Sequence, residues 1–285
     1  MENAVVFPSE GLSLAGTFST PDKTSGKLPG LVLAHGFAGA RYPAMATHFA
    51  NLGYGVLPFD FRGYGKSEGE RGMVIPKEQV TDIRSAVSYL ASRPEIDVDR
   101  IAVVGSSLGG AVAIIATAQD DRIKACVAGC PLAKGDSTLR MLYKTDKEYA
   151  AFMDVLKKKK QKNERLARFD IVYIPEKLRS ALPPGAVMDF SADTVYGFLA
   201  LNPLEAVSRL APRPLFIIAA EDDHVVPVTD SYALAERAGK NCDLEILKTG
   251  DHFIFSLMTV AEKVGNWLVR NFPPNAGAQS SSPPR

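Results

Sequence analysis

A serine in a short glycine-rich turn is the feature of this sequence best suited to chemistry. Residues 105–109 read Gly-Ser-Ser-Leu-Gly, between the apolar run 101–104 and the helix-like run 111–116. A strand, a sharp turn and a helix in this order hold a nucleophilic serine in a strained position at the top of a sheet. Ser107 has glycine two residues away on both sides, whereas Ser106 would have valine and leucine there. We therefore predict that Ser107 is the nucleophile.

A serine hydroxyl needs a base to take its proton, so a carboxylate and a histidine should follow in the order Ser, Asp, His. The chain holds four histidines. His252 follows the strand-like run 244–247 and precedes a final helical pattern, which is the position expected of the base. His48 lies in a predicted helix, and His224 lies too near the acidic residues to be oriented by them easily. We predict that His252 is the base.

The orienting carboxylate should come just after a late buried strand. Glu221, Asp222 and Asp223 follow the apolar run 214–220. Position alone does not choose between Asp222 and Asp223, and a solvated acidic turn would have the same pattern.

The sequence resembles the α/β-hydrolase family over nearly all of its length. Strand patterns at 4–7 and 12–18 come first, and the segment 60–67 reads Asp-Phe-Arg-Gly-Tyr-Gly-Lys-Ser. Such a segment recurs in proteins similar to serine aminopeptidases, acyl-peptide and X-prolyl peptidases, dienelactone hydrolases and bacterial acyl esterases. The resemblance implies an α/β fold with a mostly parallel, doubly wound sheet, in which Asp60 and Arg62 organise the loop.

The same resemblance implies roles for two further segments. The family's loop Gly-x-x-Asp-x-x-Val-Pro aligns with 220–227, which places Asp223 at the acid, although residue 220 is alanine here. The His-Gly-Phe turn at 35–37 follows the strand-like run 30–34. In this pattern the backbone N–H groups of Phe37 and Leu108 form the oxyanion hole.

Short apolar strands alternate with helical patterns in most of the chain, which is typical of a parallel sheet with helices on both faces. The predicted strands are 30–34, 55–58, 101–104, 123–130, 214–220 and 244–247, and the predicted helices are 44–52, 77–92, 111–116 and 255–271.

The regular alternation breaks after residue 130. We predict a hydrolase core formed by 1–133 and 203–272, a cap insertion at 134–202 and a disordered tail at 273–285. Within the cap, 139–143 and 149–156 have helical patterns, and the lysines at 157–160 are expected to form a solvated helix face. Candidate substrate-binding residues are Phe37, Tyr143, Phe190 and Phe198.

Composition limits the possible partners. The chain has 285 residues, 46% of them apolar and 23% charged, and a formal net charge of +1, which predicts no general attraction to nucleic acid or anionic membranes. Three cysteines form no disulfide framework or metal-ligand pattern. No signal-peptide or membrane-spanning pattern is present, so we expect a soluble cytoplasmic protein, a monomer or homodimer, without a metal or organic cofactor.

These residues predict a serine hydrolase with a Ser107–Asp223–His252 triad and an acyl-enzyme intermediate. The favoured reaction is cleavage of a carboxylic ester of a small to medium, largely apolar substrate, as in carboxylesterases. A peptidase or amidase, or a pathway hydrolase for a thioester, a lactone or a carbon–carbon bond, would use the same groups. A non-catalytic ligand-binding member of the fold is the alternative from a different class.

Overall fold

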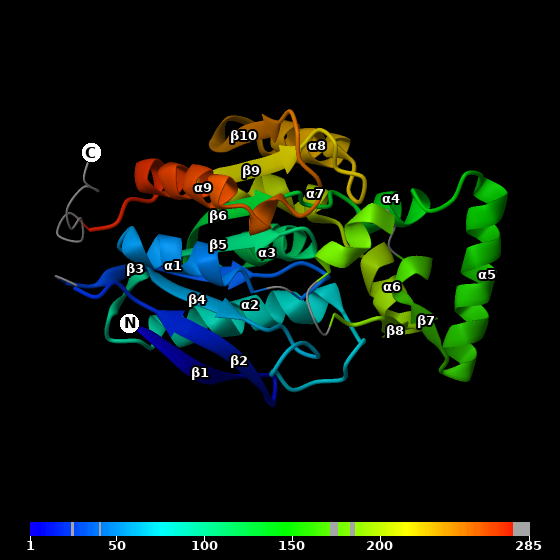
Figure 1. The fold of residues 1–285 in the computed structure, drawn as a ribbon, viewed down its shortest axis with the longest axis horizontal. Coiled ribbons are helices and arrows are strands. Elements are labelled where there is room, and N and C mark those ends of the chain that lie inside the picture. Colours follow the sequence, from blue (N-terminus) through cyan, green and yellow to red (C-terminus); the bar gives the residue numbers. More distant parts are fainter. Residues whose placement is uncertain (24–25, 40, 172–175, 183–185, 276–285) are drawn as a thin grey trace.

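The computed structural model describes residues 1–23, 26–39, 41–171, 176–182 and 186–275. Its centre is an eight-stranded sheet in the order β1-β2-β4-β3-β5-β6-β9-β10 (Figure 1). The strands from β4 to β10 pair in parallel, whereas β1 and β2 pair antiparallel at one edge. The prediction of a mostly parallel, doubly wound α/β sheet is therefore confirmed. The strands are β1 Glu2–Ser9, β2 Leu12–Ser19, β3 Leu28–Ala34, β4 Gly55–Phe59, β5 Ile96–Ser106, β6 Ile123–Gly129, β9 Leu215–Ala220 and β10 Cys242–Leu247.

Helices cover both faces of this sheet. Helices α1 (Pro43–Asn51) and α9 (Met258–Asn271) pack on one face, where Phe49 and Trp267 are buried. Helices α2 (Pro76–Ala91), α3 (Leu108–Gln119) and α8 (Val228–Ala238) pack on the other. Because both faces are covered, the central strands β3, β4 and β9 are buried along their whole length, which explains their continuous apolar runs.

The last helix begins later than the sequence pattern suggests. The predicted helix 255–271 is a short 3₁₀ turn, Ile254–Ser256, followed by α9, which starts at Met258. Leu257 separates them because its backbone is extended, with φ −88° and ψ 133°. Apolar residues at helical spacing continue through both pieces, so the pattern could not reveal the break.

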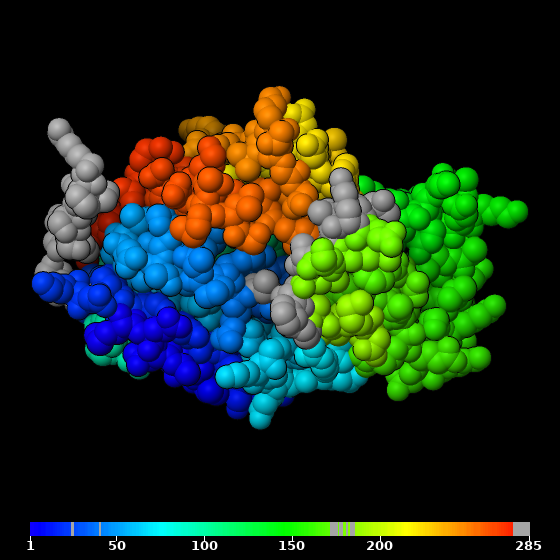
Figure 2. All heavy atoms as spheres, viewed as in Figure 1, coloured from blue at the N-terminus to red at the C-terminus, as the bar shows by residue number. Residues whose placement is uncertain are grey.

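Residues 134–202 are here called the predicted cap, and the part of this range that the structure describes lies at one end of the molecule (Figures 1 and 2). They contain α4 (Gly135–Arg140), α5 (Asp146–Lys162) and α6 (Ala192–Leu199), a two-stranded antiparallel sheet of β7 (Arg165–Ala167) and β8 (Asp189–Ser191), and the 3₁₀ turns Arg168–Asp170 and Glu176–Ala181. Short segments α7 (Pro203–Ala206) and Val207–Leu210 lead back to β9. The small sheet was not predicted, because three-residue strands have no recognisable alternation.

Helix α5 is the outermost element of the predicted cap (Figure 1). Thr145 and Glu148 form a capping box at its start, and only Leu156 in it is fully buried. The lysines at 157–160 lie in its exposed second half, where Lys160 pairs with Asp193 of α6. Consecutive helical residues point in directions about 100° apart, so these four lysines surround the second half of α5 and do not form a single face.

The first residues of the predicted tail contact the core. The Asn275 side chain donates to the Lys27 carbonyl and accepts from Arg100, which also donates to the Pro273 carbonyl. Residues 276–285 lie outside the described residues. In the described part of the chain, no helix has the length and apolar character needed to cross a membrane.

Candidate active site

Ser107 lies at the turn between β5 and α3, at the carboxyl end of the sheet. Its backbone has φ 56° and ψ −123°, a conformation that non-glycine residues rarely adopt and that is characteristic of functional sites. Its N–H group donates to the Gly129 carbonyl at the end of β6, at 2.7 Å. The turn is thus attached to the neighbouring strand, which holds the strained serine in place.

Two glycines allow this turn to form. A Cβ atom on Gly105 would lie 2.2 Å from the Gly109 carbonyl oxygen. A Cβ on Gly109 would lie 2.4 Å from the carbonyl oxygens of both Ala34 and His35, at the end of β3. Because these neighbours are backbone atoms that cannot move aside, any side chain would force the turn apart. This is the physical reason for the glycine spacing around Ser107.

The structure brings the three predicted triad residues together. His252 Nε2 lies 2.7 Å from Ser107 Oγ, and His252 Nδ1 lies 2.8 Å from Asp223 Oδ2. Each of the three is 8–9% exposed. Ser107 follows β5, Asp223 follows β9, and His252 lies after β10. These three strands run parallel in one sheet, with β6 between β5 and β9, so their carboxyl ends bring all three residues to the same end of the sheet.

The loop after β9 distinguishes Asp223 from its neighbours. Its Oδ1 accepts the N–H groups of Val225 and Val226 at 2.8 and 2.9 Å, which leaves Oδ2 for His252. Burial would raise the pKa of Asp223, but His252 and these backbone donors outweigh it, and the pKa is lowered. Asp222 and His224 are exposed. The geometry therefore assigns the hydrogen bond to His252 to Asp223 and not to Asp222.

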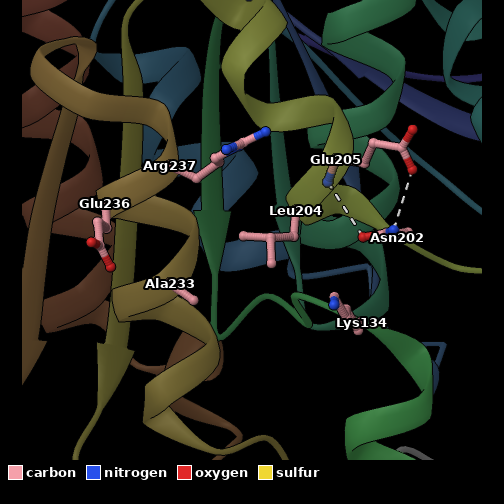
Figure 3. Close-up of a pocket in the computed structure, with 7 residues that line it drawn as sticks. All are labelled: Lys134, Asn202, Leu204, Glu205, Ala233, Glu236 and Arg237. Atoms are coloured by element: carbon pink, nitrogen blue, oxygen red, sulfur yellow. Dashed lines mark hydrogen bonds between the residues drawn. The ribbon is translucent and has the colours of Figure 1, made fainter.

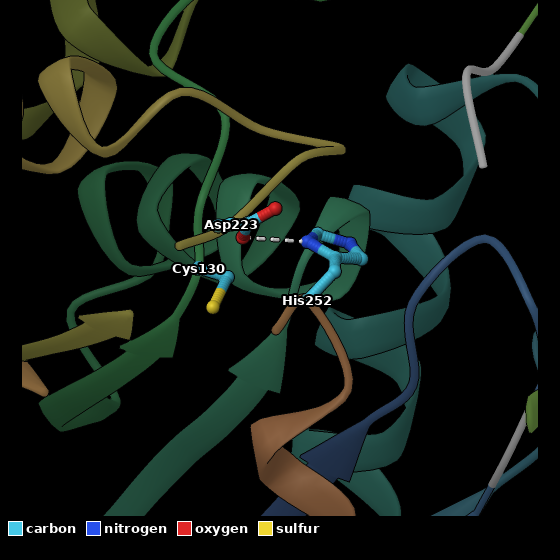
Figure 4. Close-up of side chains that lie close together, drawn as sticks. All are labelled: Cys130, Asp223 and His252. Atoms are coloured by element: carbon cyan, nitrogen blue, oxygen red, sulfur yellow. Dashed lines mark hydrogen bonds and ion pairs between the residues drawn. The ribbon is translucent and has the colours of Figure 1, made fainter. Parts of the chain in front are cut away.

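A buried cysteine lies behind the carboxylate. Cys130 follows β6, and a ligand atom from each of Cys130, Asp223 and His252 lies within 4.8 Å of the other two (Figure 4). Burial and the negative charge of Asp223 raise the pKa of the Cys130 thiol. A zinc ion held by Nδ1 and Oδ2 would keep these atoms about 3.3 Å apart, so their 2.8 Å hydrogen bond fits a triad better than a metal centre.

The turn after β3 lies directly against Ser107. A Cβ on Gly36 would be 3.0 Å from Ser107 Cβ and 3.1 Å from the Ser106 carbonyl oxygen. The Gly36–Phe37 peptide is therefore adjacent to the serine. Leu108 is the first residue of α3, so its N–H group has no acceptor within the helix. Both predicted oxyanion donors thus belong to backbone next to Ser107.

His35 has a structural place in this turn. Its Nδ1 lies 2.8 Å from the Gly36 carbonyl oxygen, and its Nε2 accepts the Phe61 N–H at 3.1 Å. This pair of contacts requires a neutral ring with the proton on Nδ1. Burial lowers the pKa of His35, despite the opposing effect of its hydrogen bond to Gly36. His35 therefore connects the turns after β3 and β4 and does not contact Ser107 Oγ.

Replacing His35 by glutamine is expected to change the acid sensitivity of the fold. Because the pKa is lowered in the folded state, the unfolded chain binds more protons as pH falls below about 6.5, and stability is lost. Glutamine does not titrate. His35→Gln should be less stable by about 1–3 kcal/mol at neutral pH, from a backbone group left unpaired, but should lose less on acidification. Urea unfolding at two pH values measures both effects.

The matched control for this experiment is His224→Gln, which removes an exposed histidine. It should follow the wild type at both pH values. An equal loss of stability on acidification in wild type and His35→Gln would contradict a buried, neutral His35.

Three of the four predicted substrate-binding residues pack together. Phe37 stacks on Phe190 with 4.4 Å between the ring centroids and meets Phe198 edge to face at 5.0 Å. These contacts join the turn after β3 to the predicted cap. Tyr143 lies elsewhere, packed against Tyr149 and Phe152 near the start of α5.

The Asp60 and Arg62 side chains organise the loop after β4. Asp60 is buried, pairs with Arg41 at 3.1 Å and accepts the Lys66 N–H at 3.0 Å. Arg62 binds both carboxylate oxygens of Asp82 in α2, at 2.7–3.1 Å. Both side chains are thus bonded to groups in other parts of the chain, as expected for residues that organise the loop.

A polar surface groove of about 650 Å³ lies at the boundary between the predicted cap and the core (Figure 3). Lys134 and Asn202, the two ends of the predicted cap, lie on it together with Arg237 of α8. None of its lining residues belongs to the Ser107–His252–Asp223 arrangement. The groove is thus separate from the candidate active site.

Two residues beside Phe37 were missed by sequence reasoning. The Tyr64 hydroxyl and the Arg168 guanidinium both donate to the Phe37 carbonyl, at 3.1 Å. Tyr64 lies within the segment 60–67, for which the family resemblance implies roles only for Asp60 and Arg62. No sequence pattern around Arg168 indicates that this residue contacts Phe37.

An α/β hydrolase is defined by a mostly parallel sheet, a serine on a strand-to-helix turn, and a carboxylate and a histidine after later strands. This chain has that arrangement. Residues 29–256 match the family model described as serine aminopeptidase, S33. The chain belongs to this family and is an enzyme of the α/β-hydrolase type.

The similar proteins include one without an assigned activity and two whose names state different activities. An uncharacterized 31.7 kDa protein from the traX-finO intergenic region of Escherichia coli is 32% identical over 243 residues, covering 79% of this chain and 82% of that one. The polyketide transferase grgF of Penicillium is 27% identical over 265 residues, covering 85% and 86%. The thiohydrolase aneE of Aspergillus aculeatus is 39% identical over 127 residues, covering 43% and 39%.

The fold is also similar to that of solved structures. The crystal structure of the α/β hydrolase GrgF from Penicillium aligns with a TM-score of 0.76 at 24% identity, over 95% of this chain and 99% of that chain.

Proposed function

We propose that this protein is a serine hydrolase that cleaves carboxylic esters of small to medium, largely apolar substrates through an acyl-enzyme. The observation that carries the proposal is the continuous hydrogen-bond path from Ser107 Oγ through both ring nitrogens of His252 to Asp223, at 2.7 and 2.8 Å. A serine in a strained turn with this path has both the position and the base that a nucleophile needs.

The mechanism follows from these contacts. Ser107 Oγ attacks the ester carbonyl carbon while its proton passes to His252 Nε2, and Asp223 stabilises the resulting imidazolium. The N–H groups of Phe37 and Leu108 bind the negatively charged oxygen. The imidazolium then gives its proton to the leaving alcohol, which leaves an acyl group on Ser107. His252 next takes a proton from water, whose oxygen attacks the acyl carbon. As the bond to Ser107 Oγ breaks, the imidazolium returns this proton to Oγ, which releases the acid and restores the free serine and the neutral histidine.

The aromatic cluster of Phe37, Phe190 and Phe198 supports an apolar substrate. These rings are buried and join the turn beside Ser107 to the predicted cap, so we propose that an acyl or alcohol group bound at the serine packs against this cluster. Aromatic surface contributes to binding through the area it buries and provides no charge that would select an ionised substrate. The proposal includes these three residues in the substrate site, with Tyr143 as a more distant part of the predicted cap.

Thioester cleavage is the second candidate. A thioester carbonyl would pass through the same steps, with a thiol as the leaving group. The relative named a thiohydrolase and the relative named a polyketide transferase favour it. The relative named a transferase also supports a variant of this reaction in which an alcohol or amine, instead of water, accepts the acyl group.

A matched set of acyl compounds tests the proposal. The same acyl groups, from acetyl to decanoyl, are offered as p-nitrophenyl esters, as the corresponding thioesters and as p-nitroanilides. We expect ester turnover that disappears after treatment with a fluorophosphonate, which labels active serines. Faster thioester turnover would favour the second candidate. No turnover of any compound, with no labelling of the protein, would contradict a serine hydrolase.

A further inference from the structure

The most unusual side chain near the candidate active site is a buried arginine of the predicted cap. Arg168 follows β7 and is 1% exposed. Arginine is almost never fully buried unless it is paired. Within the part of the chain that the structure describes, no carboxylate forms an ion pair with Arg168, and burial lowers the pKa of its guanidinium. Its N–H groups must therefore donate to neutral acceptors.

Backbone carbonyls provide these bonds, one on each side of the boundary between cap and core. Arg168 Nε donates to the Val187 carbonyl of the predicted cap at 2.7 Å, and Nη2 donates to the Phe37 carbonyl of the core at 3.1 Å. The guanidinium also lies over the rings of Phe37 and Phe190, 4.8 and 5.1 Å from their centroids. One side chain thus holds Phe37 by both its carbonyl and its ring.

The Phe37 carbonyl has a second donor. The Tyr64 hydroxyl binds it at 3.1 Å. Burial raises the pKa of Tyr64, so the hydroxyl keeps the proton it donates. A carbonyl oxygen has two lone pairs, and these two donors use both. The Phe37 carbonyl lies in the peptide that follows Phe37, so these two bonds and the stacked ring fix the Cα end of the residue. The Phe37 N–H lies in the preceding Gly36–Phe37 peptide, whose carbonyl oxygen lies 2.8 Å from His35 Nδ1 and accepts the Gly39 N–H at 3.0 Å. Held on both sides, Phe37 has little freedom to rotate its N–H group.

Packing alone does not explain a charged residue at this place. Burying an ion costs several kcal/mol, and an apolar residue of similar size would fill the same space without that cost. A guanidinium adds two features that such a residue lacks. Its planar fork reaches two carbonyls at once, and its positive charge lies close to the backbone where negative charge would develop in the reaction.

We propose that Arg168 is a positioning residue for the oxyanion hole. It holds the Phe37 N–H group in its active direction, and it makes that direction depend on docking of the predicted cap. The inference rests on the proposed function, because it assigns Phe37 the role of oxyanion donor. Arg168 acts through Phe37 and does not itself contact the substrate.

The test compares Arg168→Lys with Arg179→Lys, a matched change at an exposed arginine of the predicted cap. Loss of an oxyanion donor typically lowers the rate about 10²–10³-fold, so loss of its support should lower kcat about 10–10²-fold with KM nearly unchanged. Arg179→Lys should match the wild type. If the wild type is active and a folded Arg168→Lys variant has the same kcat, only the role of Arg168 is overturned. If the wild type itself is inactive, the proposed function is overturned as well.

A pair of inhibitors separates positioning from general damage. A trifluoromethyl ketone forms an oxyanion on the serine, whereas an unreactive amide of the same skeleton does not. Affinity of Arg168→Lys for the ketone should fall by the same factor as kcat, while affinity for the amide stays the same. An equal loss for both inhibitors would indicate a merely structural role and overturn the proposal.

In Arg168→Gly, added guanidinium should restore part of kcat, and ethylammonium should not.

If the Arg168 variants do not fold, the Tyr64→Phe variant tests the inference instead. It removes only the second donor to the Phe37 carbonyl and keeps the ring packed on His35. We expect a loss of about threefold to tenfold in kcat, with unchanged KM and the same selective loss for the ketone. Wild-type kcat in folded Tyr64→Phe would contradict support of Phe37 through its carbonyl.

Discussion

Replacing Ser107 by alanine is expected to abolish turnover of acyl substrates, with a loss of at least about 10⁴-fold in kcat/KM. His252 would keep its hydrogen bond to Asp223, but no nucleophile would remain 2.7 Å from Nε2. Alanine can replace serine in the strained turn without a larger side chain, so the fold should be retained. Ester hydrolysis and fluorophosphonate labelling measure the effect, and thermal unfolding verifies the fold.

The matched control is Ser106→Ala, the other serine of the same turn. Ser106 ends β5 and is buried, with no hydrogen bond to His252 among the described contacts. Its replacement should keep most of the activity and the labelling. Loss in Ser106→Ala with activity retained in Ser107→Ala would reverse the assignment of the nucleophile.

Replacing Asp223 by asparagine is expected to lower kcat by about 10⁴-fold with the fold retained. The backbone donors at Val225 and Val226 should hold the amide oxygen in the place of Oδ1. The amide nitrogen would then face His252 Nδ1 and donate to it, so the ring proton would move to Nε2. A protonated Nε2 cannot accept the proton of Ser107. The pH profile and kcat on the best ester measure this loss.

Asp222→Asn is the control that separates the two neighbouring acids. Asp222 is exposed, and its variant should keep most of the activity. The opposite result, with Asp222→Asn inactive and Asp223→Asn active, would contradict the assignment. A large loss in both variants, accompanied by lower melting temperatures, would mean that the loop conformation depends on each carboxylate.

The residues of the candidate triad could be found from the sequence because each has a local signal. The glycines around Ser107 indicate a tight turn, and the structure explains them, because a Cβ atom on Gly105 or Gly109 would lie only 2.2–2.4 Å from backbone carbonyl oxygens. His252 was chosen among four histidines by its place after a late strand. The choice between Asp222 and Asp223 needed the family resemblance, because adjacent residues in one loop have the same local signal.

The residues that support the candidate site could not be found in this way. Arg168 lies 131 residues from Phe37 in the sequence, and nothing near it indicates burial or a contact with a turn in the core. Tyr143 is an aromatic residue of the predicted cap, as are Phe190 and Phe198, yet it packs in a different aromatic cluster. Such contacts depend on how the predicted cap docks on the sheet.

The sequence by itself determined the mostly parallel sheet and the candidate nucleophile and base, with their places after particular strands. Periodicity, glycine spacing and strand order act over a few residues, and parallel strands bring their carboxyl ends to one edge. Only the tertiary structure decided which backbone groups hold the Asp223 carboxylate, which aromatic rings pack on Phe37, and that Arg168 binds the Phe37 carbonyl. These are contacts between distant segments, and their geometry results from the packing of the whole chain.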